Sequence, residues 1–198
     1  MQYHTKQHRR INNSIQTDNS TTAFFCINVS IEQLDRYRVA GELASHQCRY
    51  SMLFRAPEDD VLPYCAEHNV AGICYLSLEQ GLLTGKVGPD RIFNAGDWRA
   101  NAEQWLPWFR RENRQKLLDM FAGWQDLLEH HNCTIAQLVI AWTAAQPGAT
   151  HILCGLRIAD QGIEAAGAAA ILLSESDVQR ISTDLTALGN PVTEQLGG

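Results

Sequence analysis

Short apolar segments alternate along the chain with longer segments in which apolar residues recur at helical spacing. The short segments are typical of buried parallel strands, and they predict strands at residues 23–27, 45–50, 71–75 and 151–154. Each predicted strand is followed by an amphipathic segment. Because strand and helix recur in this order four times, the sequence predicts an α/β fold with four parallel strands.

The predicted helices begin at residues that suit a helix N-terminus. Ser30, Thr134 and Ser174 each precede an amphipathic run, where a hydroxyl can accept a hydrogen bond from a free backbone N–H group. Asp177 stands in the capping-box position relative to Ser174. The predicted helices span residues 31–40, 57–68, 112–131, 134–146, 159–170 and 174–188.

Residues 1–22 show neither pattern and consist mostly of polar residues with a basic cluster. Such a segment buries too little apolar surface to offset the entropy cost of ordering it. We therefore predict a disordered polar N-terminal tail at 1–22, followed by one domain at 23–198. His4 and His8 have the spacing of a metal pair on one helical face, but no third ligand accompanies them. The sequence predicts no metal site.

The composition is ordinary for a globular protein, with 45% hydrophobic and 19% charged residues among 198. A net charge of −6 gives no reason to expect nucleic acid or an anionic membrane as partner. No apolar run approaches the ~20 residues that span a bilayer, and no signal-peptide core is present near the N-terminus. The six cysteines lack CxxC spacing, so we expect buried free thiols and a reducing, cytoplasmic setting.

The stretch 74–86, CYLSLEQGLLTGK, joins the third predicted strand to a loop of small and polar residues. In α/β enzymes such loops carry ligand-binding groups, because the strand end is rigid and the loop is free to vary. Gly81 and Gly85 allow backbone N–H groups to approach an anion, and Thr84 and Lys86 stand nearby. The same residue types fit an ordinary exit from a strand equally well.

A long irregular segment follows at 86–107. It contains Phe93, Trp98 and Trp105 together with several glycines and prolines. A loop of this kind is typical of a lid over a substrate, and it is equally compatible with a packed surface loop.

The stretch 74–86 resembles the AYSPLGQGLLTGK segment of aldo-keto reductases. Further segments are similar to that family in the same order, over residues 28–188. NVSIEQL is similar to SNFSVEQL, HQCRYSMLFR to NQxxYNLLxR, and AQPGATHILCGLRIADQGIEAA to AxPGVTxVIxGARxxEQLEEN. The chain is identified as a member of this family, whose fold is an eight-stranded βα barrel. The resemblance implies a partial TIM (β/α)8 barrel in which residues 23–198 form the C-terminal half.

The resemblance also implies NADPH as cofactor and a small carbonyl compound as substrate. The residues that match cofactor-holding positions are Asn28 and Gln47 (nicotinamide carboxamide), Tyr75 (nicotinamide ring), Leu78, Gln80 and Gly81 (pyrophosphate), and Gly155, Arg157, Gln161 and Glu164 (2′-phosphate, adenine and ribose). Considered without the family, Arg157 beside a helix N-terminus fits an anion site and also an ordinary solvated arginine.

Four positions depart from the family pattern. Ile27 and Leu76 replace serines, and Ala165 replaces an asparagine. Glu79 replaces a glycine that faces the phosphates. Each change removes a hydrogen bond or adds repulsive charge, so weakened or lost cofactor binding is expected.

No catalytic residue is assigned, because the family's catalytic Asp, Tyr, Lys and His come from the half of the barrel that this sequence does not match. Without that tyrosine, hydride transfer lacks an acid. One hypothesis is therefore a truncated NAD(P)H-dependent oxidoreductase that is inactive alone. A second is a half-barrel that pairs with a copy of itself or another chain through its sheet edges and an apolar inner face of Ile73, Ile152 and Leu153. A third is a frameshifted relic.

Overall fold

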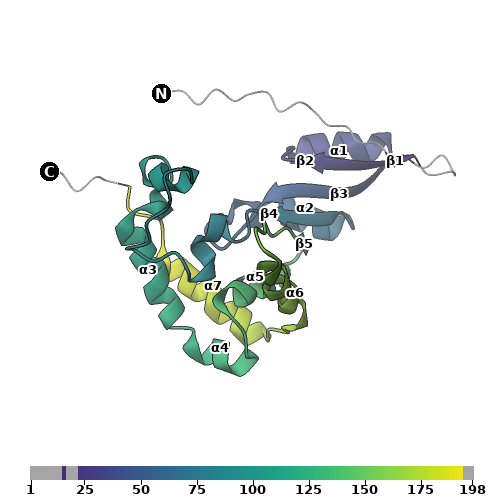
Figure 1. Ribbon diagram of the computed structural model, residues 1–198. Coiled ribbons are helices and arrows are strands. Elements are labelled where there is room, and N and C mark those ends of the chain that lie inside the picture. The colour runs from purple at the N-terminus through teal and green to yellow at the C-terminus, as the bar shows by residue number, and fades with distance from the viewer. Residues whose placement is uncertain (1–14, 17–21, 194–198) are drawn as a thin grey trace.

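The computed structural model describes residues 15–16 and 22–193, and at its centre is a five-stranded sheet (Figure 1). The strands lie side by side in the order of the chain. β2 to β5 run parallel, which confirms the predicted four parallel strands, and β1 pairs antiparallel with β2. The bounds are β1 (Ile15–Gln16), β2 (Thr22–Ile27), β3 (Glu42–Arg49), β4 (Ala71–Tyr75) and β5 (Ala149–Ile152).

β1 was not expected, because it lies inside the segment predicted to be a disordered tail. It has only two residues, which is too short to produce an alternating pattern in the sequence. Ile15 is aligned with Ala23, so β1 continues the hydrogen-bonding ladder outward from β2. Residues 1–14 and 17–21 of the predicted tail, including His4 and His8, lie outside the described residues.

The helices follow the predicted sequence order. They are α1 (Ile31–Ala40), α2 (Val61–Glu67), α3 (Arg111–Ala122), α4 (Gln125–His131), α5 (Ile135–Ala144), α6 (Ala159–Gly167) and α7 (Glu175–Leu188). Short 3₁₀ helices connect them: η1 (Ala56–Glu58), η2 (Glu79–Thr84), η3 (Trp98–Gln104), η4 (Pro107–Phe109) and η5 (Ala168–Ala170). Capping boxes form at Ser30, Thr134 and Ser174.

The predicted single helix at 112–131 is in fact two helices. The N–H groups of Gly123 and Trp124 bond to the carbonyls of Met120 and Phe121, three residues back, so the turn tightens and α3 ends. Glycine is a poor helix former because it gains conformational freedom outside the helix. Trp124, buried at the break, donates from Nε1 to Asp184 of α7 at 2.8 Å and so fixes the angle between α3 and α4.

One face of the sheet packs against helices. The register aligns Cys48 with Cys74 and Cys74 with Ile152, and all three join the main hydrophobic core. α2 packs on β4, and α5 packs on β5. In Figure 1 α3, α4, α5 and α7 gather beyond β5, while α1 lies with β2 and β3 at the opposite end of the sheet.

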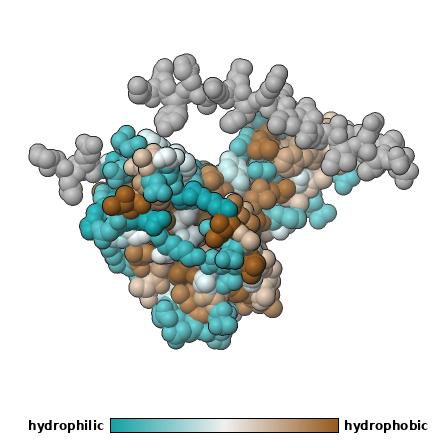
Figure 2. Space-filling view, in the orientation of Figure 1, coloured by the Kyte–Doolittle hydropathy of each residue, from teal (hydrophilic) through white to brown (hydrophobic). Residues whose placement is uncertain are grey.

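The other face of the sheet carries side chains that are half-buried or exposed. Its middle row runs from Ile27 through Gln47 and Ile73 to His151, and Ile27 is 41% exposed. Hydrophobic surface is visible over β2 to β4 in Figure 2. Ile152 was predicted to lie on this face, but it points to the covered side, because strand residues alternate between the two faces.

The sheet is open. Within the described residues β5 has a neighbouring strand on one side only, so the strands do not close into a barrel. All six cysteines are free thiols, and Cys26, Cys48, Cys65 and Cys74 are buried, as predicted. No described helix combines the length and the apolar character that crossing a membrane requires.

Candidate functional site

Asn28 and Tyr75 meet at the carboxyl ends of β2 and β4. The Tyr75 hydroxyl lies 3.0 Å from Asn28 Nδ2 and 3.2 Å from Asn28 Oδ1. Asn28 has a left-handed backbone with φ of 50°, a conformation that asparagine tolerates better than most residues. Its backbone N–H donates to the Gln47 carbonyl at 3.0 Å, which extends the β2–β3 ladder by one residue and fixes the direction of the Asn28 side chain.

Gln47 lies between these two residues on the open face of β3. It is aligned with Ile27 on one side and with Ile73 on the other. Its two aligned neighbours lie one residue before Asn28 and two residues before Tyr75, so the Gln47 amide lies close to this pair near the carboxyl ends of the strands. The structure thus gathers the three residues that the sequence assigned to the nicotinamide.

His46, next to Gln47, supports this arrangement from the covered face. Its side chain is buried, and Nε2 accepts a hydrogen bond from the Val29 backbone N–H at 3.4 Å. Burial lowers the pKa of His46 to about 4, so the ring is neutral near pH 7. A neutral ring accepting from the residue after Asn28 helps to hold the β2–α1 turn, a contact that no sequence pattern indicated.

The loop after β4 turns sharply. Leu76, Glu79 and Gln80 have positive φ values of 59°, 42° and 58°, and Gly81 follows with 102°. For non-glycine residues each such conformation costs on the order of 1–3 kcal/mol and persists only where the surroundings impose it. A run of this kind is typical of a binding loop, and the assignment of Gln80 and Gly81 to a pyrophosphate stays a prediction.

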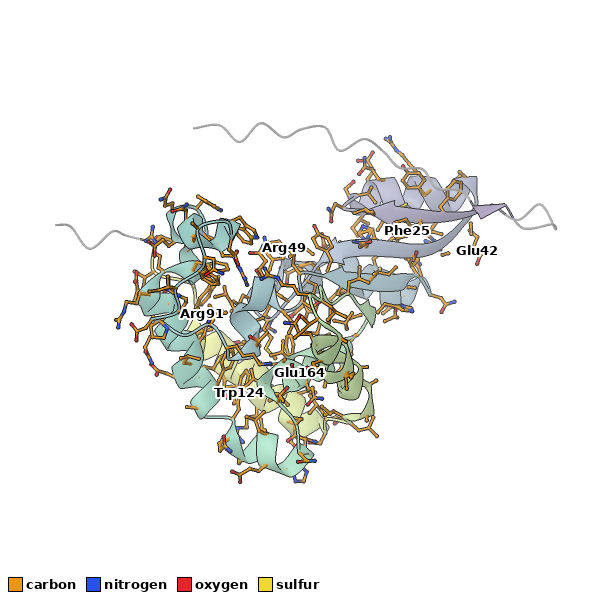
Figure 3. All side chains as sticks on the ribbon, viewed as in Figure 1. Phe25, Glu42, Arg49, Arg91, Trp124 and Glu164 are labelled. Carbon is orange, nitrogen blue, oxygen red and sulfur yellow. The ribbon has the colours of Figure 1, made fainter. Side chains whose placement is uncertain are left out.

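Glu79 points into the protein. Its carboxylate accepts from Ser51 Oγ at 2.6 Å and lies 3.1 Å from Arg49 Nη2. The Glu79 side chain is 8% exposed, and Arg49 in turn stacks over the Phe54 ring at 4.4 Å. The expectation that Glu79 adds repulsive charge toward phosphates is therefore wrong, because Arg49 neutralises it. Figure 3 shows Arg49 near the end of β3, between the sheet and the helical part.

The segment at η3 is attached to this loop. Arg99 donates from Nη1 to the Gln80 carbonyl at 3.0 Å. Its Nε and Nη2 bond the two oxygens of Asp97 at 2.9 and 2.6 Å, and its guanidinium lies over the Phe93 ring at 4.6 Å. Part of the long aromatic segment at 86–107 therefore packs beside the loop after β4, which both the lid and the surface-loop interpretations allow. No sequence pattern indicated the roles of Asp97 and Arg99.

Arg157, Gln161 and Glu164 line the start and one side of α6. The Arg157 backbone N–H donates to Gln161 Oε1 at 2.8 Å, and Arg157 Nη1 lies 3.7 Å from Asp97. Glu164 pairs with Lys86 Nζ at 2.9 Å, and the hydrogen bond from Lys86 holds the pKa of Glu164 below its usual range. The Glu164–Lys86 pair connects α6 to the loop after β4, and the Arg157–Asp97 contact connects the segment before α6 to the start of η3.

Gly155 completes this side of the site. A Cβ atom added at Gly155 would meet nothing within 4 Å, so the backbone there borders open space. Leu78 is half-buried at the start of η2 and packs against the main core. The structure thus forms two groups from the predicted residues, one around Tyr75 and one around α6, joined by η2. Among the described residues no cluster of three or more metal-ligating side chains occurs.

Three comparisons with known proteins all find aldo-keto reductases. The sequence model of the Aldo/keto reductase family matches residues 26–183. The chain is 36% identical over 165 residues to an NADH-specific methylglyoxal reductase of Escherichia coli K12, covering 83% of this chain and 49% of that protein. It is 29% identical over 171 residues to the aldo-keto reductase YhdN of Bacillus subtilis 168, covering 86% and 50%.

Solved structures show the same relationship. The glycerol dehydrogenase AKR11B4 of Gluconobacter oxydans superposes with a TM-score of 0.76 at 27% identity, over 91% of this chain and 54% of that one. The chain spans about half the length of the curated relatives it matches. The four parallel strands and their helices correspond to part of the aldo-keto reductase TIM barrel, with the sheet left open. This chain belongs to the aldo-keto reductase family.

Proposed function

We propose that this chain binds a nicotinamide dinucleotide at the carboxyl ends of β2, β3 and β4 and along the start of α6. The observation that carries the proposal is the contact between Asn28 and Tyr75 beside Gln47. Two amides and an aromatic ring therefore lie near the carboxyl ends of three neighbouring strands. Amides offer a donor and an acceptor in a fixed plane, as the nicotinamide carboxamide requires. The Tyr75 ring would lie against the nicotinamide.

The remaining groups fit the rest of a dinucleotide. The tight turn with Gln80 and Gly81 would hold the pyrophosphate, with Leu78 beside it, and Gly155 leaves open space next to α6. Gln161 and Glu164 would hold adenine and ribose. Arg157, 66% exposed, has a guanidinium able to bond a 2′-phosphate, so binding of NADPH in particular would depend on this residue.

Several features weaken the site without removing it. Ile27, Leu76 and Ala165 offer no hydrogen bonds from their side chains. The Lys86 and Arg157 cations are already paired with acids, although both are largely exposed, and exposed ion pairs contribute only about 0–1 kcal/mol. Either cation can therefore turn toward a phosphate at small cost, while its acidic partner stays in place.

When bound, the reduced nicotinamide supplies a hydride to a carbonyl carbon. Within this chain Asn28 and Gln47 would orient the ring, and Tyr75 would support its face. The Tyr75 hydroxyl is bonded to Asn28, and the family's catalytic tetrad belongs to the half of the barrel that these residues do not match. We propose that the 198 residues alone bind cofactor and do not reduce small carbonyl compounds.

The six free cysteines support a reducing compartment such as the cytoplasm.

Calorimetric titration with NADH and with NADPH tests the proposed function. The unaltered chain is expected to bind at least one of them with one site. Tyr75→Ala removes the ring and its contact to Asn28, so affinity is expected to fall about tenfold or more. Tyr75→Phe is the matched control: it keeps the ring and is expected to retain most of the affinity. Equal affinity in all three proteins would refute the site.

A second candidate function rests on the open sheet face. Ile27 and Leu153 are 41% and 44% exposed, and β5 has an unpaired edge among the described residues. Exposed apolar residues beside a free strand edge favour association. Sedimentation equilibrium tests whether the chain self-associates. A concentration-dependent mass would support a half-barrel that pairs with a copy of itself, and a constant monomer mass would exclude it.

A further inference from the structure

Asp97 is a fixed carboxylate at the edge of the candidate cofactor site. Its side chain is 16% exposed and accepts hydrogen bonds from the Arg99 backbone N–H at 3.1 Å and from Arg99 Nη2 at 2.6 Å. Hydrogen bonding by Arg99 is the main reason that the pKa of Asp97 lies well below its usual range, and the charge of Arg157 lowers it further. Asp97 is therefore ionised at neutral pH.

Asp97 cannot easily move away. Arg99 is tied to the Gln80 carbonyl at 3.0 Å and lies over Phe93, so the ion pair is attached to the loop after β4. Asp97 is also the N-cap of η3. The carboxylate is thus held in place relative to η3 and the loop after β4.

Arg157 is the cation that Asp97 faces from the other side. The distance from Arg157 Nη1 to Asp97 Oδ2 is 3.7 Å, and the arginine is 66% exposed against 16% for the carboxylate. The fixed partner is therefore Asp97, and the adaptable partner is Arg157. Any phosphate that bonds Arg157 must share it with this carboxylate, whereas a ribose hydroxyl meets no such repulsion and can donate to it.

We propose that Asp97 sets the cofactor preference of this chain by opposing the 2′-phosphate of NADPH at Arg157 while leaving NADH unaffected. The proposal rests on the proposed function, since it concerns the same site. It agrees with the name of one relative, the NADH-specific reductase that is 36% identical to this chain. Asp97 is a specificity-determining residue in this account and takes no part in hydride transfer.

The test is the ratio of NADPH to NADH dissociation constants, measured by calorimetry for the unaltered chain and for Asp97→Asn. Asparagine has a similar shape and still caps η3, so the fold is expected to persist. Removing the charge is expected to tighten NADPH about fivefold and to leave NADH within twofold. Asp97→Ser, which also caps a helix, gives a second protein with the same expectation.

Asp90→Asn is the matched control. Asp90 lies in the same long loop, is 81% exposed and pairs with Arg111, so removing its charge is expected to leave the ratio unchanged. The double variant Asp97→Asn/Arg157→Gln tests whether Asp97 affects NADPH binding through Arg157. The gain in NADPH affinity should vanish in the Arg157→Gln background.

An unchanged ratio in both Asp97 variants, with the cofactors still bound, would overturn this inference and leave the proposed function intact. A gain that persists in the double variant would also overturn it, since Asp97 would then act without Arg157. If the unaltered chain binds neither cofactor, the proposed function fails and this inference fails with it.

Discussion

The Tyr75 hydroxyl lies 3.0 Å from Nδ2 of Asn28, a residue 47 positions away in the chain. This contact joins the carboxyl ends of two strands that are separated in the sheet by β3. It helps to place the Tyr75 ring near the carboxyl ends of the strands, on the face of the sheet that carries Gln47 and the proposed nicotinamide site.

Asn28 is expected to contribute to binding through its amide and to folding through its backbone. Asn28→Gly removes the amide but suits the left-handed φ of 50°, so cofactor affinity should fall about five- to tenfold with little loss of stability. Asn28→Ala should lose the same affinity and an additional ~1 kcal/mol of unfolding free energy, because alanine is strained there. Calorimetry and urea unfolding measure the two effects. Unchanged affinity in both variants would remove Asn28 from the site.

The Glu79–Arg49 pair is expected to matter for stability. Glu79→Ala leaves the Arg49 guanidinium partly buried without its carboxylate, so the unfolding free energy should fall by about 2 kcal/mol. The double variant Arg49→Met/Glu79→Gly removes both charges, and glycine relieves the positive φ at position 79. It should regain most of the loss. Urea unfolding measures the free energy of unfolding of both variants. An unchanged value for Glu79→Ala would show that the Glu79–Arg49 pair does not contribute to stability.

Because His46 is buried, we expect the free energy of unfolding to fall on mild acidification. Burial lowers its pKa from 6.5 to about 4 in the folded chain, so protonation favours the unfolded state. The contribution of the neutral, buried His46 ring to the free energy of unfolding is fully present above pH 6.5. It is lost as the pH falls from 6.5 toward 4. Between pH 7 and pH 5 this corresponds to about 2 kcal/mol of unfolding free energy.

His46→Asn is the comparison protein for that prediction, because it cannot titrate in this range. Urea unfolding at pH 7, 6 and 5 should give a steeper decline for the unaltered chain than for the variant. Parallel declines would mean that other groups carry the pH dependence.

The elements of secondary structure were largely predictable, because their signals are local. Ser30, Thr134 and Ser174 cap helices in the structure as the sequence indicated. The break between α3 and α4 was missed, since the hydrophobic stripe continues across it and only Gly123 indicates the end of α3. β1 was missed because two residues carry no periodicity.

The candidate site was predictable only in part. Strand order brings Asn28, Gln47 and Tyr75 together, so their proximity followed from the expected parallel sheet. Their assigned roles stay predictions. The Arg49–Glu79 and Asp97–Arg157 contacts join segments far apart in the chain, and no local pattern predicts which acid pairs with which base. Glu79 was therefore expected to face the phosphates, whereas Ser51 and Arg49 hold it inside.

Arg157→Ala is expected to weaken NADPH binding by about 1–3 kcal/mol and to leave NADH nearly unchanged, because only NADPH carries the 2′-phosphate. Arg36→Ala is a suitable control, since Arg36 on α1 is 75% exposed and pairs with Glu32 within its own helix. Calorimetry with both cofactors measures the effect. Equal losses for NADH and NADPH would mean that Arg157 does not contact the 2′-phosphate.

The central claim, that these residues bind the cofactor but provide no acid for catalysis, is tested by following NADPH and NADH in one sample. Nicotinamide fluorescence reports binding, and nicotinamide absorbance after adding aromatic and aliphatic aldehydes reports oxidation. We predict a saturable fluorescence change and no loss of absorbance above the protein-free rate. Saturable oxidation that Tyr75→Ala abolishes would contradict the account, since the chain would then supply its own proton donor at this site.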